Sequence, residues 1–204
     1  MINKEKEESK VQIKKKKKEN ELFSAAYELF TTKGTKDTAI DDIVKRAGVA
    51  KGTFYLYFKD KYDIINKLIL LKSSIVVKEA MLEVEEQGLK EFEDKIVYFI
   101  NYIINYFKEN KLMLKLINKN LSWGVFKRAL MRNEEYRDME EVVIFFMNNM
   151  VNNNVTEEEA MINLFLIFEL VGSVCYSSII HNEPTDIDSI KPILFKKVLA
   201  LLRE

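Results

Sequence analysis

The stretch from Thr38 to Tyr62 constrains the fold of this chain more than any other part, because two short helical patterns flank a glycine. Apolar residues at spacings of three and four give the first pattern one apolar face, and Gly48 follows where a left-handed residue normally ends a helix. Phe54 and Phe58 predict a second helix, over about residues 50–58, with both rings turned inward. Such a pair is typical of a helix-turn-helix, whose second helix enters the DNA major groove.

Capping residues predict where the neighbouring helices begin. Thr38 with Asp41 forms a short-acid capping box at the start of the first helix, and Asp60 with Asp63 predicts the cap of a third, longer one. The outer side of the second helix then carries basic, hydroxyl and aromatic groups: Lys51, Thr53, Tyr55, Leu56 and Tyr57. A generic helical hairpin is the alternative, but packing alone explains the small residues and outward aromatics poorly.

The segment GVAKGTFYLYFKDK, residues 48–61, resembles the DNA-binding signature of the TetR/AcrR family of bacterial transcriptional regulators. The resemblance covers about residues 19–65 and includes AAYELF at 25–30 and KGT at 33–35. It implies that Thr38 contacts a backbone phosphate, and that further DNA contacts come from Lys51, Thr53, Tyr55 and Leu56 at bases or sugars and from Tyr57 and Lys61 at phosphates.

One position departs from the family pattern. Ala50 stands where many relatives carry a serine or threonine, so the hydroxyl contact expected there is missing. Leu56 can offer only an apolar contact, for example to a thymine methyl group.

Charge is distributed unevenly along a neutral chain. Residues 1–61 hold 15 basic and 10 acidic side chains, whereas the remainder holds 17 and 22. A basic amino-terminal module suits a polyanionic partner such as double-stranded DNA. Residues 1–18, which end in five lysines from Lys14 to Lys18, are expected to be a mobile arm. The arm either adds phosphate contacts or is a solvated extension that continues into the first helix.

Several classes of protein are disfavoured. Cys175 is the only cysteine and His181 the only histidine, and no phosphate loop or metal-ligand spacing occurs. We therefore expect no catalytic residues, no metal and no cofactor, and do not expect an enzyme. Cys175 fits a buried packing position better than a redox sensor, and His181 a helix end. No run approaches the ~20 apolar residues that span a bilayer, so we expect no membrane association and a cytoplasmic location.

The fold class expected is all-α with about nine or ten helices: an amino-terminal three-helix helix-turn-helix domain (19–65) and a carboxy-terminal helical regulatory and dimerisation domain (66–204). Only two prolines occur, and no alternating strand pattern stands out. Helices are predicted over about 19–33, 60–86, 91–109, 111–120, 122–133, 135–151, 156–181 and from 190 onward, with a turn at 152–154.

The last two helices are the candidate dimer interface. Two apolar stripes from each subunit could form a four-helix bundle across a two-fold axis, as the resemblance implies. The residues are Phe165, Gly172, Cys175, Ile179, Ile190, Leu194, Val198 and Leu201. The alternative is that these stripes pack inside one subunit.

The resemblance also implies a small-molecule pocket in the carboxy-terminal domain. Large, adaptable side chains that could line an apolar cavity are Tyr98, Tyr102, Tyr106, Met113, Trp123, Phe126, Met147 and Phe168. Taken singly, each such residue is more often part of an ordinary core than a ligand contact. Glu169 either faces a cationic or hydroxylated ligand or is a solvated or interface charge.

The sequence thus favours a dimeric DNA-binding transcriptional regulator, commonly a repressor, that a small, largely apolar inducer releases from a palindromic operator. A regulator controlled by a protein partner or by its abundance, without an inducer, remains the second hypothesis.

Overall fold

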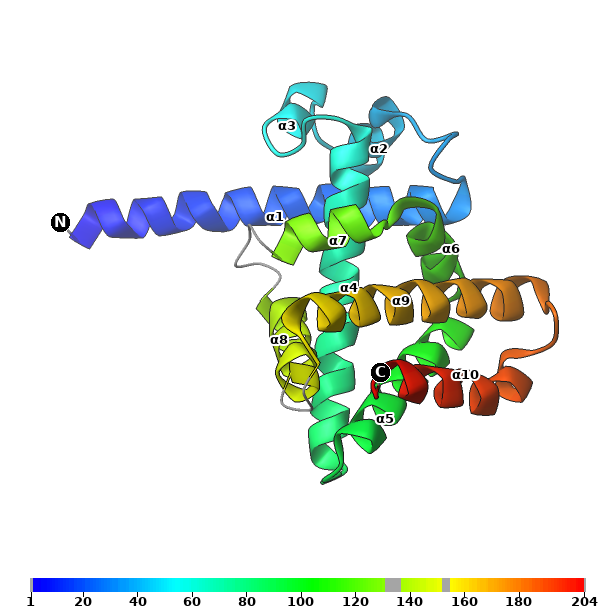
Figure 1. Ribbon diagram of the computed structural model, residues 1–204. Coiled ribbons are helices and arrows are strands. Elements are labelled where there is room, and N and C mark those ends of the chain that lie inside the picture. The colour runs from blue at the N-terminus through cyan, green and yellow to red at the C-terminus, as the bar shows by residue number, and fades with distance from the viewer. Residues whose placement is uncertain (1, 131–136, 152–154, 204) are drawn as a thin grey trace. The chain divides into compact units, whose positions relative to one another are not determined.

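The structure of the protein is a computed structural model that describes residues 2–130, 137–151 and 155–203. These residues form ten α-helices and one π-helical turn and include no strand, which confirms the all-α prediction (Figure 1). The chain divides into two compact units, one ending at Leu68 and one beginning at Ile69. The division falls within a single helix, α4 (Lys61–Glu86), so this helix belongs to both units.

The amino-terminal unit contains α1 (Ile2–Thr32), α2 (Ile40–Ala47), α3 (Lys51–Tyr55) and the beginning of α4. Its core includes Leu22, Ile43, Phe54 and Phe58, each exposed by 1% or less. The rings of Phe54 and Phe58 lie 5.4 Å apart, so the inward orientation predicted for both is confirmed. Burial of two such aromatic side chains contributes roughly 3–6 kcal/mol to holding the short α3 in place.

The first helix begins much earlier than expected. Residues 2–18, predicted as a separate mobile arm, continue α1 without a break. Side chains from Gln12 to Lys18 are exposed, which makes this part of α1 a solvated, strongly basic helix.

The turn between α2 and α3 has the predicted geometry. Gly48 adopts φ +67° just beyond α2, a conformation that side-chain-bearing residues rarely take. The amide of Val49 donates to the Val44 carbonyl at 3.0 Å and closes the helix end. The beginning of α2, however, is shifted by one residue: Ala39 is the N-cap, and Oδ2 of Asp42 accepts its amide hydrogen at 3.0 Å.

The carboxy-terminal unit contains the rest of α4 and the helices α5 (Phe92–Glu109), α6 (Lys111–Asn120), α7 (Trp123–Leu130), α8 (Arg137–Val151), α9 (Glu157–Tyr176) and α10 (Ile187–Leu201). A π-helical turn, η2 (Ser177–His181), extends α9. The predicted Thr156 capping box is confirmed, because Thr156 Oγ1 accepts the Glu159 amide at 3.3 Å and Glu159 Oε2 accepts the Thr156 amide at 3.0 Å. The predicted turn at 152–154 and the helix ends placed at 131–136 lie outside the described residues.

Helix α9 packs against α5, α6, α8 and α10 within this unit. Together with η2 it spans 25 residues with a mean hydropathy of 1.7 in its most apolar window, so by length and composition it could cross a membrane. The expectation that no segment is long and apolar enough to span a membrane was therefore wrong. The packing against four neighbouring helices is that of a helix at the centre of a helical domain, which passes the same test of composition.

Candidate DNA-binding surface and ligand cavity

Helix α3 and the residue that follows it carry exposed side chains on the outer side and a buried phenylalanine on the inner side. Lys51, Tyr55 and Leu56 face solvent, with Tyr55 exposed by 53% and Leu56 by 76%, whereas Phe54 between them is fully buried. Thr53 and Tyr57 are half-buried. An ammonium, a phenol and an aliphatic tip on one short helix are groups that can contact phosphates, base edges and thymine methyls.

Thr38 occupies a different place from the one that the resemblance implies. It is 1% exposed, and its hydroxyl donates to the Gly34 carbonyl at 2.7 Å. The hydroxyl thus closes the turn after α1 in this structure, and a phosphate contact of Thr38 stays a prediction.

Lys61 also points into the protein. Its Nζ donates to the carbonyls of Thr35 at 2.9 Å, Lys36 at 3.3 Å and Thr38 at 3.0 Å. An ammonium has three hydrogens, and three carbonyls of the α1–α2 turn accept them here. Lys61 therefore orders the α1–α2 turn in this structure, and the phosphate contact that the resemblance implies stays a prediction.

Two residues of the same surface were missed by the sequence argument. Tyr62, the second residue of α4, is 68% exposed, and Asp41 in the first turn of α2 forms an ion pair of 2.8 Å with Lys51. The sequence does contain a signal for Tyr62. Asp60 accepts the Tyr62 amide at 2.7 Å and fixes where α4 begins, and the start of the helix determines which way Tyr62 points.

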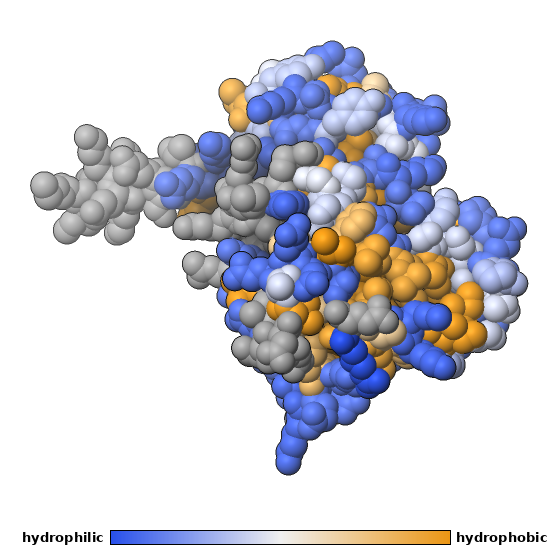
Figure 2. Space-filling model, in the orientation of Figure 1, coloured by the Kyte–Doolittle hydropathy of each residue, from blue (hydrophilic) through white to orange (hydrophobic). Residues whose placement is uncertain are grey.

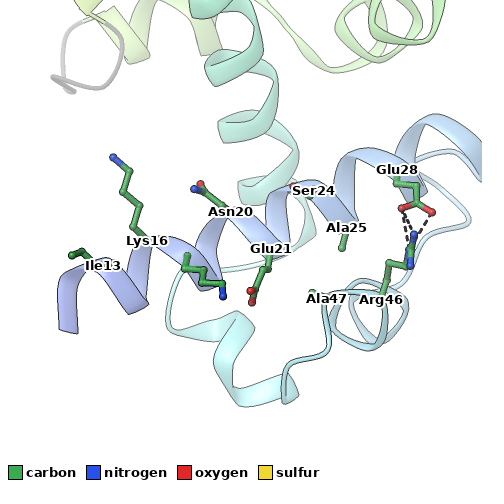
Figure 3. Close-up of a pocket in the computed structure, with 10 residues that line it drawn as sticks. Ile13, Lys16, Asn20, Glu21, Ser24, Ala25, Glu28, Arg46 and Ala47 are labelled. Carbon is green, nitrogen blue, oxygen red and sulfur yellow. Dashed lines mark hydrogen bonds and ion pairs between the residues drawn. The ribbon is translucent and has the colours of Figure 1, made fainter. Parts of the chain in front are cut away.

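An open groove lies between α1 and α2 (Figure 3). Its volume is about 620 Å³, and seven of its ten lining residues are polar or charged. Arg46 of α2 and Glu28 of α1 point toward each other across it, with Arg46 Nη2 2.7 Å from Glu28 Oε2. Because this cation is already paired and the groove is open to water, we assign no small-molecule ligand to it.

An apolar cavity lies in the carboxy-terminal unit. Its volume is about 220 Å³, and its lining comes from α4, α5, α6, α7, α8, α9 and the α6–α7 connection. The residues with polar side-chain atoms in its lining, among those described, are Ser73 and Tyr106. Its walls are otherwise aliphatic and aromatic, which suits an apolar ligand better than the open groove does.

Four of the predicted ligand residues line this cavity: Tyr106, Met113, Phe126 and Phe168. Trp123 stands behind them, with its ring 5.3 Å from Phe126 and 5.7 Å from Phe168. The lining does not include Tyr98, Tyr102, Met147 or Glu169.

Two of the residues outside the lining can be placed further. Burial, followed by the nearby Glu79 and Glu83, raises the pKa of Tyr102. Glu169 is exposed and shares one side of α9 with Ile162, Leu166 and Ser173, so its assignment to the ligand is corrected.

Sequence reasoning missed most of the aliphatic wall, including Val76, Val77, Ile103, Leu164 and Val171. The argument favoured large aromatic and sulfur-containing side chains, and aliphatic residues at helical spacing carry no signal that separates a cavity wall from solid core. Only the relative placement of six helices distinguishes the two.

The predicted dimer stripes face their own subunit. Cys175, Leu194 and Val198 are 3% exposed or less, and burial raises the pKa of the Cys175 thiol to about 12. Ile179, Ile190 and Leu201 are half-buried against the same core, and Phe165 lies 5.5 Å from the Trp123 ring. Their part in a dimer interface stays a prediction; the exposed large apolar residues of α9 and α10 are Ile162, Leu166 and Ile193.

Together these features define a helix-turn-helix protein with a second, helical domain. Residues 22–68 match the family model for bacterial regulatory proteins of the tetR family. Residues 22–68 are thus a DNA-binding domain of the tetR family, and this domain together with the similar proteins supports a tetR-family transcriptional regulator.

Similar proteins match this chain beyond its DNA-binding domain. An uncharacterised HTH-type transcriptional regulator, YhgD of Bacillus subtilis, is 23% identical over 85% of this chain and 90% of its own length. The fold resembles the crystal structure of FadR from Bacillus subtilis in complex with stearoyl-CoA, with a TM-score of 0.64, 17% identity and coverage of 88% of this chain and 97% of that one. It also resembles Thermus thermophilus FadR in complex with lauroyl-CoA, with a TM-score of 0.61, 18% identity and coverage of 90% and 92%. At these identities the two structures support the fold alone.

Proposed function

We propose that the protein is a dimeric, sequence-specific repressor that acts in the cytoplasm and is released from a palindromic operator by a small, largely apolar ligand. The observation that carries the DNA-binding part is the exposed row on α3. Lys51, Tyr55 and Leu56 are held outward because Phe54 and Phe58 anchor the helix from beneath. Two such helices, one per subunit and about 34 Å apart, would read two half-sites.

The dimer would form through the outer side of α9 and α10. Ile162, Leu166 and Ile193 are 48%, 40% and 63% exposed, and Figure 2 shows an apolar area on this unit. Ser173 and Glu169 complete the outer stripe of α9 with a small and a charged residue. A stable interface buries about 800 Å² per partner, and apolar positions on two adjacent helices suit a contact of that size.

The ligand would act from the apolar cavity through α4. Ser73, Val76 and Val77 of this helix line the cavity. Its first residue, Lys61, donates hydrogen bonds to the α1–α2 turn of the DNA-binding domain. A ligand that shifts the part of α4 at the cavity can therefore disturb the α1–α2 turn of the DNA-binding domain, because α4 is one continuous helix. A ~100-fold loss of operator affinity requires about 2.7 kcal/mol of differential ligand binding. The acyl-CoA complexes of the two similar structures support an acyl chain as one suitable ligand body.

Operator binding is tested with DNA selected from a random pool by the full-length protein. Tyr55→Ala should weaken binding to the selected site by about tenfold or more, which corresponds to about 1.4 kcal/mol. Leu112→Ala is the matched control, because Leu112 is equally exposed but lies on α6 of the other unit. Equal affinities of both variants and the wild type in a gel-shift titration would contradict the assignment of α3 as the recognition helix.

The dimer is tested by Leu166→Lys, with sedimentation or light scattering as the measurement. The added charge should convert the dimer to a monomer and lower operator affinity with it, and a dimer of unchanged stability would exclude this face of α9. Ile75→Lys, which changes a similarly exposed residue on α4, is the control.

The ligand site is tested by Gly172→Leu. Gly172 lines the cavity, and a Cβ placed on it meets no atom within 4 Å, so a larger side chain can enter. The variant should keep operator binding and lose stabilisation by any ligand that stabilises the wild type. If no compound in a metabolite panel stabilises the wild-type protein, control by a protein partner or by abundance is favoured.

A further inference from the structure

We infer that the ligand of the apolar cavity is an uncharged aromatic compound, built on one substituted ring or two fused rings. The inference rests on the ligand-responsive function proposed above and narrows the class of its ligand. Three properties of the cavity carry it: the lack of charge in its walls, the number of aromatic rings that line it, and its volume.

The cavity offers no partner for a charged group. Among the described residues that line it, none has an ionised side chain, and the polar side-chain groups are the hydroxyls of Ser73 and Tyr106. An ion that leaves water for such surroundings loses its hydration without gaining an opposite charge, which is strongly disfavoured. A carboxylate or an ammonium on the ligand would therefore have to stay outside the cavity, whereas an uncharged molecule can enter whole.

Stacked aromatic rings form part of the cavity wall. Phe126 of α7 and Phe168 of α9 both line the cavity, and their ring centroids lie 5.4 Å apart with the planes 29° from parallel. The ring of Trp123 packs against both, at 5.3 Å and 5.7 Å. Three further rings of the lining come from α5: Phe99, Tyr106 and Phe107. Because aromatic rings gain from offset-stacked and edge-to-face contacts beyond the area that they bury, these walls favour an aromatic ligand over an alkyl chain.

The volume of the cavity limits the size of the ligand. An apolar cavity of about 150 Å³ holds one benzene molecule, and this cavity has about 220 Å³. The additional space suits two fused rings or one ring with a short alkyl group, roughly eight to ten carbons in all. A compact ring compound of this size fits, whereas a long acyl chain would have to extend beyond the cavity.

The first test compares three probes that share a benzene ring and a methylene group and differ in charge: ethylbenzene, phenylacetate and benzylammonium. Binding to the full-length protein is measured by calorimetry, with thermal stabilisation as a second readout. We expect ethylbenzene to bind at least ~10-fold more tightly than either ion, because the cavity cannot pair their charges. Equal or tighter binding of phenylacetate or benzylammonium would overturn the inference.

The second test separates an aromatic ring from an alkyl chain. The probe 1-octanol is uncharged and has as many carbons as ethylbenzene, and we expect it to bind at least ~3-fold more weakly. Phe168→Leu should reduce this preference for the ring. Phe92→Leu is the matched control and should leave the preference unchanged, because Phe92 of α5 packs in the core of the same unit without lining the cavity. The comparison of two probes within each variant cancels a general loss of stability. An equal affinity of the wild type for both probes, or a preference that survives Phe168→Leu, would refute the aromatic class.

Gly172→Leu locates the bound probe. Gly172 lines the cavity with open space beside its backbone, so the leucine side chain should fill that space and abolish ethylbenzene binding. Retained binding would place ethylbenzene elsewhere and overturn the inference.

Decanoate separates a failure of this inference from a failure of the proposed function. If decanoate stabilises the wild type and releases the operator while ethylbenzene and naphthalene do neither, the inference falls and the ligand-responsive regulator stands. If neither the rings nor decanoate nor any compound of a metabolite panel releases the operator, the proposed ligand response falls as well. The operator affinity measured in the same preparations tests the DNA-binding part separately.

Discussion

The ammonium of Lys51 in α3 lies 2.8 Å from Oδ1 of Asp41 in α2, so the first lysine of the proposed recognition helix is paired with a carboxylate before DNA arrives. Hydrogen bonding to Asp41 raises the pKa of Lys51 and keeps it charged. Both side chains are more than half exposed, and water and salt screen exposed pairs of this kind, so the pair contributes little to stability. A DNA phosphate can therefore compete for Lys51 at little cost.

Asp41→Asn should tighten DNA binding. The substitution frees Lys51 and removes a negative charge from the surface that faces phosphates, and the expected gain is up to about 1 kcal/mol, or roughly fivefold. Because the effect is electrostatic, it should appear with operator and non-specific DNA alike and diminish at high salt. Affinities from fluorescence anisotropy at several salt concentrations provide the measurement, with Asp37→Asn, an exposed acid of the preceding turn, as the comparison. Weaker binding of Asp41→Asn would show instead that Asp41 orients Lys51 toward its target.

Lys61→Met should destabilise the protein and leave the salt dependence of DNA binding unchanged. Three carbonyls of the α1–α2 turn lose their donor, and hydrogen bonds to charged groups contribute about 1.5–3 kcal/mol. We expect a loss of about 2 kcal/mol in denaturant unfolding. Lys59→Met, at an exposed neighbour, should have no such effect. A stable Lys61→Met protein whose slope of log affinity against log salt is smaller by about 0.9 would restore Lys61 as a phosphate contact.

The directions in which the Thr38 and Lys61 side chains point could not be predicted from the sequence. Helix positions follow from local signals: the Asp60 cap and Gly88 bracket α4 correctly, and α6 occupies the predicted residues 111–120. Whether a hydroxyl or an ammonium turns inward depends on carbonyls that lie 4 residues away along the chain for Thr38 and 23 to 26 for Lys61, and no local pattern specifies their directions.

Helix α9 shows the same limit for packing. It is apolar on more than one side, so its spacing predicts a helix but not which side is covered by its own subunit. The stripe through Cys175 turned out to face the core, and the stripe through Leu166 faces outward. The cavity was beyond prediction for a related reason, since its existence depends on how closely six helices approach one another.

Acid should destabilise the folded DNA-binding domain because it protonates Asp42. A hydrogen bond from Lys33, followed by that from the Ala39 amide, lowers the pKa of this carboxyl from its ordinary 3.8. A carboxyl with a lowered pKa in the folded state stabilises that state at neutral pH, and the stabilisation is lost as the pH falls below about 4 through the folded value.

The measurement is the unfolding midpoint between pH 7 and pH 3. The wild type should lose stability over the acid part of this range. Asp42→Asn should be less stable at pH 7 and lose less on acidification, because the group that titrates is gone. Parallel curves for the two proteins would show that other carboxyls, such as Glu159 at the start of α9, account for the acid sensitivity.

The lysine run of α1 offers a test of how far the DNA contact extends. Lys14 to Lys18 occupy five consecutive helical positions and therefore point in directions all round the helix, so that only two or three of them can face one surface. Replacement of all five by Gln preserves helix propensity and removes the charge. If this part of α1 contacts DNA, the slope of log affinity against log salt should fall by about 2, at ~0.9 per lost phosphate contact. Replacement of Lys111, Lys115 and Lys119 on α6 by Gln controls for general charge. An identical slope in the five-fold variant and the wild type would leave α1 up to Lys18 as a solvated helix and confine the DNA contact to α2, α3 and the start of α4.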